Sequence, residues 1–483
     1  MSGEGKSTLG NLMLKVVFYF VIALLGWVIP AIEPMTQTGM KVFFVFLATI
    51  YGWTVTGDVW PSLFSLIMFP LTGVVDMKQF IAMGWGGDTM VFMILVFTLI
   101  KFLEVCGVSQ HIAAWMMSRP FLKGHPWRLI FMIQLTAYVI CSLVNIFVGM
   151  FLVWEIVYTI TQASGGKPYD KFPSMMVFGI ALLGALSLSA MPWGGNAIVN
   201  LAVYANIVGE PANMVRYLVF TVPYGILSIF VYMALCKFLF RLDVSPLKAI
   251  DMKFCGVDAL KMTPEKRIAF TTLAVFIIML LVPSVLPKDH PVFQIYLRMG
   301  AAGILIGIFA VLSLIQVKGQ RVFNFAELAT KGVPWNMVMM IAVILAIGGS
   351  LMHESTGIKA FLEQNMVPLV SGLSPALFII AIIIMVVFLT NFTINMVIVA
   401  MFLPIVIPMA PTMGVSAEQI SYLIMVASTI AVLTPAGCAA AAILFPNTKW
   451  IKVKDIYKYG VPSVIALTVL ALLVNFLWLG LFY

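Results

Sequence analysis

Residues 375–410 read PALFIIAIIIMVVFLTNFTINMVIVAMFLPIVIPMA, an apolar stretch with a polar centre from Thr390 to Asn395. A membrane-spanning helix needs about 20 largely apolar residues, so this stretch is too long for one span. Each limb beside the centre has only about 15 residues, which is short for a complete span. Backbone groups inside a bilayer must find partners within the protein. We therefore interpret the stretch as a re-entrant hairpin of two short helices; two full spans are the alternative.

The same pattern occurs near residues 128–160, where Asn145 interrupts a second long apolar stretch, and we predict a second re-entrant hairpin there. Further apolar stretches lie near 13–31, 39–57, 60–75, 88–105, 175–207, 216–240, 268–287, 294–316, 334–352, 418–446 and 460–482. Each of these is a candidate for one membrane span. The sequence thus predicts an all-α polytopic membrane protein with about eleven transmembrane helices plus two re-entrant hairpins.

The overall composition agrees with lipid as the main solvent. Of the 483 residues, 62% are hydrophobic and only 10% are charged, whereas about 25% of the residues in an ordinary soluble domain are charged. This excludes a soluble enzyme, a disordered chain and a secreted disulfide scaffold. The five cysteines show no CxxC pairing, so neither a zinc site nor a disulfide framework is indicated.

The positions of the basic residues predict the orientation, because lysine and arginine collect in cytoplasmic loops. With the N-terminus inside and both hairpins counted as re-entrant, most of the 28 basic residues fall on the cytoplasmic side. We therefore predict a multi-pass protein of the plasma (inner) membrane of a prokaryote-like cell, with a cytoplasmic N-terminus. The net charge of +9 reflects this orientation and requires no nucleic-acid partner.

The two halves of the chain resemble each other. The corresponding segments are 104–107 (EVCG) with 354–357 (ESTG), Asn145 with Asn395, and 192–197 (PWGGNA) with 435–440 (PAGCAA). The first two pairs are 250 residues apart, and the third is displaced by 243. An odd number of full crossings separates equivalent points, so the second copy is inverted in the membrane. Inverted repeats with interrupted helices are typical of secondary transporters, whose sites lie near the bilayer midplane.

This repeat divides the chain into four parts. We predict an N-terminal leader with the first span, a first repeat with its hairpin, a cytoplasmic linker, and a second repeat with its hairpin. Their bounds are 1–38, 39–240 with the hairpin 128–160, 241–267, and 268–483 with the hairpin 375–410.

Four breaks interrupt the apolar stretches: the two hairpin tips and two mid-span loops, at 189–196 and 433–438. The helix after each break aims free N–H groups and a positive dipole end at the break, which favours an anion. The unwound carbonyl oxygens can hold Na⁺. Proline and glycine could instead only kink these helices, but four breaks paired by a repeat favour a binding site.

With this layout the chain resembles the divalent anion–sodium symporter family, which includes di- and tricarboxylate and sulfate transporters, as a divergent member. The resemblance rests on corresponding hairpin tips, the proline- and glycine-interrupted spans, and 333–336 (VPWN) opening the span before Glu354. It covers the chain from about residue 13 to 482. It implies eleven spans, two re-entrant hairpins, a homodimer, and an elevator-like movement of the hairpin-bearing domain against a scaffold.

The family's tips carry Ser-Asn-Thr, in which the asparagine contacts substrate and the hydroxyls help to hold substrate and Na⁺. Here Asn145 and Asn395 keep the asparagine, but their neighbours are Val144, Ile146, Ile394 and Met396. A second register, 390–392 (TNF), keeps one hydroxyl. Hard cations prefer oxygen ligands, so we expect sodium dependence to be weak or absent. A proton carried by Glu155, or simple anion exchange, would then drive transport.

We predict a secondary active transporter of small anions, such as di- or tricarboxylate or sulfate, that works by an elevator-like alternating-access mechanism. A proton-coupled carrier or an anion exchanger without sodium is the alternative; a channel or an intramembrane enzyme is more remote. The candidate substrate-binding residues are Asn145, Gly194, Gly195, Asn196, Asn391, Thr393, Asn395, Thr434, Pro435 and Gly437. The candidates for ion coupling are Ser142, Asn145, Gly194, Asn395, Thr434 and Glu155. No catalytic set, no cofactor and no metal site is predicted; Na⁺ is a possible coupling ion.

Overall fold

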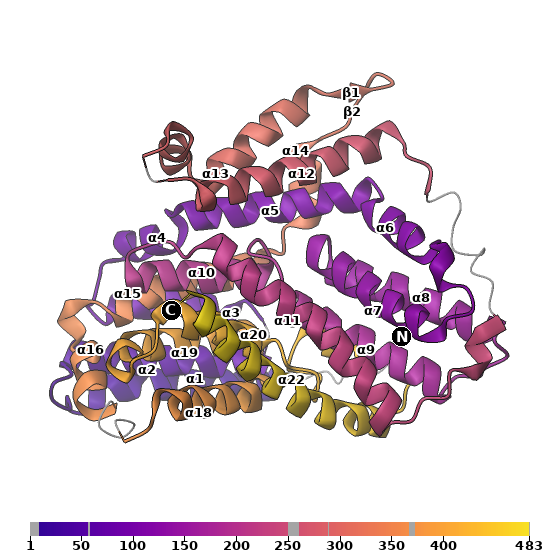
Figure 1. The fold of residues 1–483 in the computed structure, drawn as a ribbon. Coiled ribbons are helices and arrows are strands. Elements are labelled where there is room, and N and C mark those ends of the chain that lie inside the picture. The colour runs from indigo at the N-terminus through magenta and orange to yellow at the C-terminus, as the bar shows by residue number, and fades with distance from the viewer. Residues whose placement is uncertain (1–8, 57, 250–259, 288, 367–371, 483) are drawn as a thin grey trace.

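A computed structural model describes residues 9–56, 58–249, 260–287, 289–366 and 372–482. Within these ranges the chain is almost entirely helical (Figure 1). A single short hairpin of two antiparallel strands, β1 (Gln316–Val317) and β2 (Gln320–Arg321), is the exception among the described residues. The prediction of an all-α polytopic membrane protein is confirmed. The leader at 1–8 and the middle of the predicted linker, 250–259, lie outside the described residues.

By length and composition, seven described helices can cross a bilayer. They are α1 (Leu9–Val28), α2 (Gln37–Thr56), α7 (Pro126–Leu143), α8 (Ile146–Ala163), α11 (Met214–Ala234), α13 (Pro291–Leu314) and α22 (Val453–Phe482). Two bent pairs raise the number to nine. They are α5 (Asp88–Val105) with α6 (Val108–Met117), bent by 57°, and α14 (Phe325–Gly332) with α15 (Trp335–Leu351), bent by 78°.

Apart from α12, which has 22 residues, the remaining elements are shorter. The helices are α3 (Trp60–Leu71), α4 (Met77–Trp85), α9 (Lys171–Ser187), α10 (Gly195–Val208), α12 (Pro264–Val285), α16 (Ile358–Phe361), α18 (Pro375–Thr390), α19 (Asn395–Met409), α20 (Ala417–Ser428) and α21 (Ala439–Leu444). Short 3-10 or π turns occupy Pro120–Leu122, Leu235–Leu239, Ser245–Ala249, Glu354–Thr356, Leu362–Met366 and Pro411–Met413. The predicted spans 175–207 and 418–446 are therefore each two helices joined by a loop.

Both predicted hairpins consist of two helices joined at the predicted asparagine region. The limbs of the first, α7 and α8, have 18 residues each, which is longer than expected from the sequence. The limbs of the second, α18 and α19, have 16 and 15 residues. The 250-residue displacement also recurs in the backbone. Gly107 (φ +75°) and Gly357 (φ +66°) both adopt the left-handed conformation directly before a helix, which glycine adopts without steric cost.

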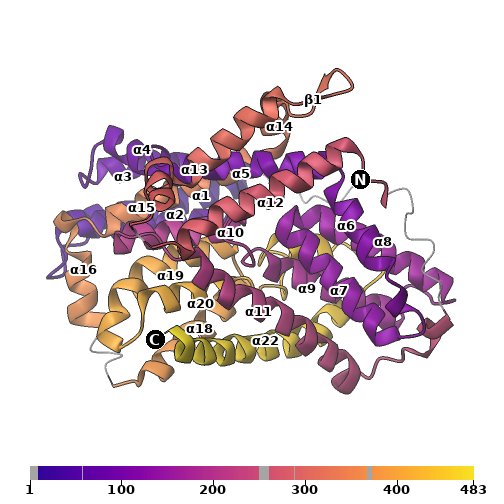
Figure 2. The same cartoon turned by 45° about the horizontal axis from the view of Figure 1, so that its top comes forward.

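The helices are arranged around a buried centre. In Figures 1 and 2, α5, α12, α13 and α14 lie together along one side, and α11 and α22 run beside each other across the molecule. Residues 172–187 of α9 and 418–428 of α20 are all buried, so these two helices form the core. Large apolar side chains on α1, α13 and α22 are exposed, as expected of helices that face lipid.

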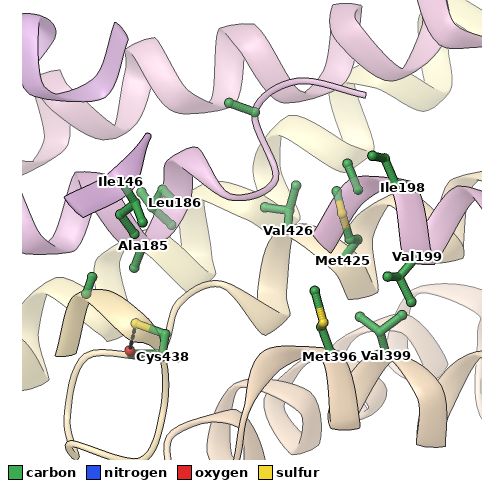
Figure 3. Packing of buried hydrophobic residues seen from close by; sticks show 14 of the residues in the cluster. Ile146, Ala185, Leu186, Ile198, Val199, Met396, Val399, Met425, Val426 and Cys438 are labelled. Atoms are coloured by element: carbon green, nitrogen blue, oxygen red, sulfur yellow. Dashed lines mark hydrogen bonds between the residues drawn. The ribbon is translucent and has the colours of Figure 1, made fainter. Parts of the chain in front are cut away.

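Buried apolar side chains pack against one another at two places in this centre (Figure 3). On one side, Ile146 at the start of α8 lies against Ala185 and Leu186 of α9. On the other side, Met396 of α19 lies below Met425 of α20. The starts of both second limbs are therefore anchored by apolar contacts, which leaves few polar groups to define a site.

Candidate functional site

A cavity of about 300 Å³ opens next to the second hairpin tip. Its lining residues come from α2, α10, α15, α19, α21 and the loops before them. They are Trp53, Asp58, Leu188, Asn196, Pro334, Asn336, Met337, Met340, Ile394, Asn395, Met396, Cys438 and Ala439. This lining is mostly apolar with a few polar groups, as is common for small-molecule sites. These lining residues include neither lysine nor arginine.

Several helices begin at this cavity. The first residue of α10 is Gly195, that of α15 is Trp335, and that of α19 is Asn395. Residues of the first turn of each helix line the cavity. The first N–H groups of a helix have no partner within it, and each N-terminus carries roughly half a positive charge. The cavity therefore favours an anion although no basic side chain lines it.

Asn196 presents an uncommitted amide to the cavity. Its side chain is only 4% exposed, and it lines the cavity from the first turn of α10. Within the described part of the chain, this amide has no protein hydrogen-bond partner. Buried amides are normally paired, so a ligand is the expected partner. Asn200, one turn further along α10, differs: its amide exchanges two hydrogen bonds with Ser421 (3.0 and 2.9 Å).

Asn395 lines the cavity and also holds the second mid-span loop. Its amide nitrogen donates to the carbonyl oxygens of Gly437 (2.6 Å) and Ser428 (3.1 Å). The partners decide this orientation. An oxygen in that place would face the two carbonyl oxygens, and the Thr390 hydroxyl, 3.3 Å away, gives its one hydrogen to the nearer Ser428 carbonyl. The Thr390 hydroxyl donates to the same Ser428 carbonyl at 2.5 Å. The tip of the second hairpin and the end of α20 are thus joined by side-chain donors.

Asn391, at the same hairpin tip as Asn395, makes a second set of hydrogen bonds. Its amide nitrogen donates to the carbonyl oxygens of Val387 (2.8 Å) and Ile430 (3.1 Å). Its amide oxygen accepts from the Leu433 backbone N–H at 2.9 Å. The Thr434 hydroxyl donates to the Asn391 carbonyl. All polar groups of this buried amide are therefore committed to the protein.

The comparisons with known proteins follow this geometry. A family model described as a citrate transporter matches residues 43–431. The chain belongs to the citrate transporter family. This confirms the resemblance to a divalent anion–sodium symporter-like family and places the chain among secondary transporters. The prediction that the chain is not an enzyme is also confirmed, because the matched proteins are transporters.

One relative and one structure extend this result. The sodium-dependent dicarboxylate transporter SdcS of Staphylococcus saprophyticus subsp. saprophyticus is 23% identical over 317 residues. The matched region covers 64% of this chain and 59% of that relative. The crystal structure of the YdaH transporter of Alcanivorax borkumensis matches with a TM-score of 0.59 at 14% identity. It covers 97% of this chain and 98% of that one, and shows that the two share a fold.

The transporter brings some of the predicted substrate residues together. Asn196 and Asn395 line the cavity, and a methyl group added at Gly195 would lie 3.6 Å from the Cε of Met337 and 3.9 Å from the Cε of Met396. Gly437 accepts a hydrogen bond from Asn395, and Thr434 of the same loop donates to the Asn391 carbonyl. Thr393 shares a hydrogen bond of 3.0 Å with Thr54 of α2. Pro435 is exposed in the same loop, and Gly194 caps α10.

The first hairpin tip of the transporter lies apart from the cavity lining. Asn145 is the N-cap of α8, and its amide oxygen accepts from the backbone N–H groups of Phe147 (2.8 Å) and Val148 (3.3 Å). The Ser142 hydroxyl donates to the Tyr138 carbonyl at 2.7 Å. Glu155 is exposed on α8. None of the three predicted residues lines the 300 Å³ cavity.

Of the lining residues that sequence reasoning did not assign to the site, three carry a side-chain N–H or oxygen group: Trp53, Asp58 and Asn336. Trp53 is buried, and its indole N–H donates to the Ser62 hydroxyl at 3.0 Å. Asp58 lies in the link between α2 and α3, which looks like an ordinary polar loop. For Asn336 a signal existed, since the 333–336 motif already marked the start of a helix.

Proposed function

We propose that this protein is a secondary active transporter that binds a small di- or tricarboxylate-like anion in the cavity between α10, α15 and α19. The observation that carries the proposal is the Asn196 amide, which is buried, has no partner among the described residues and lines the cavity. Three helix N-termini add favourable potential for negative charge, each worth about 0.3–1 kcal/mol and up to about 2 when partly buried. Asn196 is the proposed substrate contact. Asn395 lines the cavity beside it, but both of its N–H groups already donate to carbonyl oxygens of the protein.

The substrate class follows from size and charge. A volume of 300 Å³ is at the lower end of small-molecule sites, which span roughly 300–1,000 Å³. Helix N-termini bind carboxylate, sulfate and phosphate alike, so size and not charge alone limits the choice. The names of the matched family and relative, a citrate transporter and a dicarboxylate transporter, support carboxylates over sulfate.

We further propose an elevator-like movement within a homodimer in the inner membrane, with the N-terminus in the cytoplasm. The supporting features are the distribution of basic residues and the two helical hairpins; the homodimer is what the family resemblance implies. Labelling of single cysteines checks the orientation. Cys255, which lies outside the described residues, should react from the cytoplasm, and a cysteine placed at Ser416 should react from outside. Reaction of both from one side would contradict this topology.

Asp58 favours a proton-coupled carrier as the second candidate function. Its carboxylate lines the same cavity that the anion would occupy, and two like charges at close range oppose each other. A carrier that brings a proton with each anion would compensate this negative charge. Glu155 stays a candidate for this role from the sequence, although it is exposed on α8.

Thermal unfolding of the purified protein tests the proposed function. Citrate, succinate and sulfate are added separately at several concentrations, because a ligand of the folded state raises its stability by mass action. The proposal predicts that at least one carboxylate raises the unfolding midpoint, and that the same anion is taken up into proteoliposomes with saturation. A midpoint that no anion changes, together with absent uptake, would show that the cavity is not an anion site.

A further inference from the structure

The unwound segments of broken helices are the places where transporters hold sodium, through backbone carbonyl oxygens. The second mid-span loop, between α20 and α21, is such a segment. A cation bound at this loop needs two or more oxygens that point to one centre. The positions of the side-chain donors around these carbonyls therefore decide whether a sodium ion can bind.

Two amide nitrogens stand at such bridging centres. The Asn395 nitrogen lies 2.6 Å from the Gly437 oxygen and 3.1 Å from the Ser428 oxygen. The Asn391 nitrogen lies 2.8 Å from the Val387 oxygen and 3.1 Å from the Ile430 oxygen. Each nitrogen thus occupies the point between two carbonyls that a bridging cation would take.

Other donors complete this pattern around the second loop. The Thr434 hydroxyl donates to the Asn391 carbonyl, and the Cys438 thiol donates to the Ala431 carbonyl at 2.9 Å (Figure 3). The hydrogen of each donor carries partial positive charge. It therefore offsets the partial negative charge of the carbonyl oxygen and repels a cation. Uncharged side chains of the protein therefore donate hydrogen bonds to these carbonyl oxygens, in the place that a cation would take.

Side chains of α11 donate hydrogen bonds to carbonyl oxygens of the first mid-span loop in the same way. The Tyr217 hydroxyl donates to the Ser189 carbonyl at 2.5 Å, and the Thr221 hydroxyl donates to the Ala190 carbonyl at 2.8 Å. The Ser189 hydroxyl in turn donates to the Leu186 carbonyl at 3.0 Å. Both breaks therefore satisfy these carbonyls without an ion.

We propose that Asn391 and Asn395 replace bridging cations at the second break, so that this transporter binds its anion without sodium. This inference rests on the proposed function, because it concerns the ion that accompanies the anion. It distinguishes the chain from the sodium-dependent dicarboxylate transporter to which it is similar. It also gives Asn391, which has no free polar group for substrate, a role of its own.

The first experiment uses the unmodified protein. Thermal unfolding is measured in sodium chloride and in choline chloride of equal concentration, with and without citrate or succinate. We expect sodium alone to leave the unfolding midpoint unchanged, and the anion affinity to agree within about twofold between the two salts. A midpoint raised by sodium alone, or anion binding that needs sodium, would overturn the inference. If no anion binds in either salt, the proposed function fails, while the effect of sodium alone still decides the inference.

A substitution tests the bridging position directly. Asn395→Asp exchanges the donating nitrogen for an oxygen, so that three oxygens face one another and a cation becomes the favourable occupant. We expect this variant to be destabilised in choline and to gain several degrees of unfolding midpoint from sodium. Asn391→Asp should behave in the same way and serves if the first variant does not fold. Absence of a sodium effect in both variants would count against the bridging positions.

Asn200→Asp is the matched control. Its nitrogen faces a single carbonyl, that of Ser421 at 3.0 Å, and so offers no bridging centre. A buried carboxylate at this position should destabilise the protein equally in sodium and in choline. If Asn200→Asp gained as much from sodium as Asn395→Asp, the sodium effect would be a general response to a buried charge, and the inference would be wrong.

Discussion

Replacement of Asn196 by alanine separates binding from stability. The Asn196 amide has no partner among the described residues, so its removal breaks no hydrogen bond within the protein. Alanine is also the better helix former, and we expect the unfolding midpoint of the free protein to stay within about 2 °C. A hydrogen bond to a charged group is worth about 1.5–3 kcal/mol, so anion affinity should fall by about 10- to 150-fold.

Asn200→Ala on the same helix is expected to do the reverse. This amide exchanges hydrogen bonds with the Ser421 carbonyl (3.0 Å) and hydroxyl (2.9 Å), and its loss leaves buried groups unpaired. Such groups cost about 1–3 kcal/mol, so the unfolding midpoint should drop. Asn200 does not line the cavity, and the anion affinity should stay within about twofold of the wild-type value.

Isothermal titration of both variants with citrate and succinate gives their anion affinities. Thermal unfolding without ligand gives their unfolding midpoints. The reasoning would be refuted if Asn196→Ala bound the anion as tightly as the wild type. It would also be refuted if both variants lost affinity in proportion to their loss of stability. In that case the effect on binding would come from weakened folding and not from a lost contact.

Asp58→Asn should raise the anion affinity, because it removes a negative charge from the lining of the same cavity; isothermal titration of the variant with citrate checks this, and an unchanged affinity would show that Asp58 does not act on the bound anion. Glu418→Ala should lower the unfolding midpoint by an amount equivalent to about 2–3 kcal/mol, because its carboxylate accepts from the Tyr422 hydroxyl (2.7 Å) and pairs with Arg216 (3.1 Å); thermal unfolding without ligand checks this. Gly225→Ala should prevent correct packing of α7 against α11, since the new Cβ would lie 1.8 Å from the Tyr138 hydroxyl oxygen; a monodisperse variant of wild-type midpoint would contradict this expectation.

The sequence located the breaks because their signals are local. The polar centres of 128–160 and 375–410 and the prolines and glycines of both mid-span loops mark places where a helix cannot continue. The structure has helix ends at each of them. Trp53 and Asp58 gave no comparable signal, since their place in the cavity wall depends on how α2 packs beside α10, α15 and α19. Packing between distant helices is not visible in the periodicity of a single segment.

The two tip asparagines show where the repeat misleads. They are equivalent in sequence, 250 residues apart, yet Asn145 is the N-cap of α8 whereas Asn395 is the first residue of α19. This shift of one position changes what each amide can reach. The Asn145 oxygen is consumed by the first N–H groups of its own helix. Asn395 points away from its helix toward Gly437 and lines the cavity. A local alignment cannot detect a shift that only helix geometry defines.

The hydrogen bonds at the two breaks also connect the halves of the molecule. The Ser189 and Thr429 hydroxyls, one from each mid-span loop, lie 3.1 Å apart and share a hydrogen bond. Asn395 ties the second loop to the second hairpin, and Tyr217 ties the first loop to α11. Hydrogen bonds of this kind hold the loops beside the cavity in fixed positions relative to one another. Preorganised donors then meet the anion without rearrangement, and fixed dipoles take over the charge compensation that a bound cation would otherwise supply.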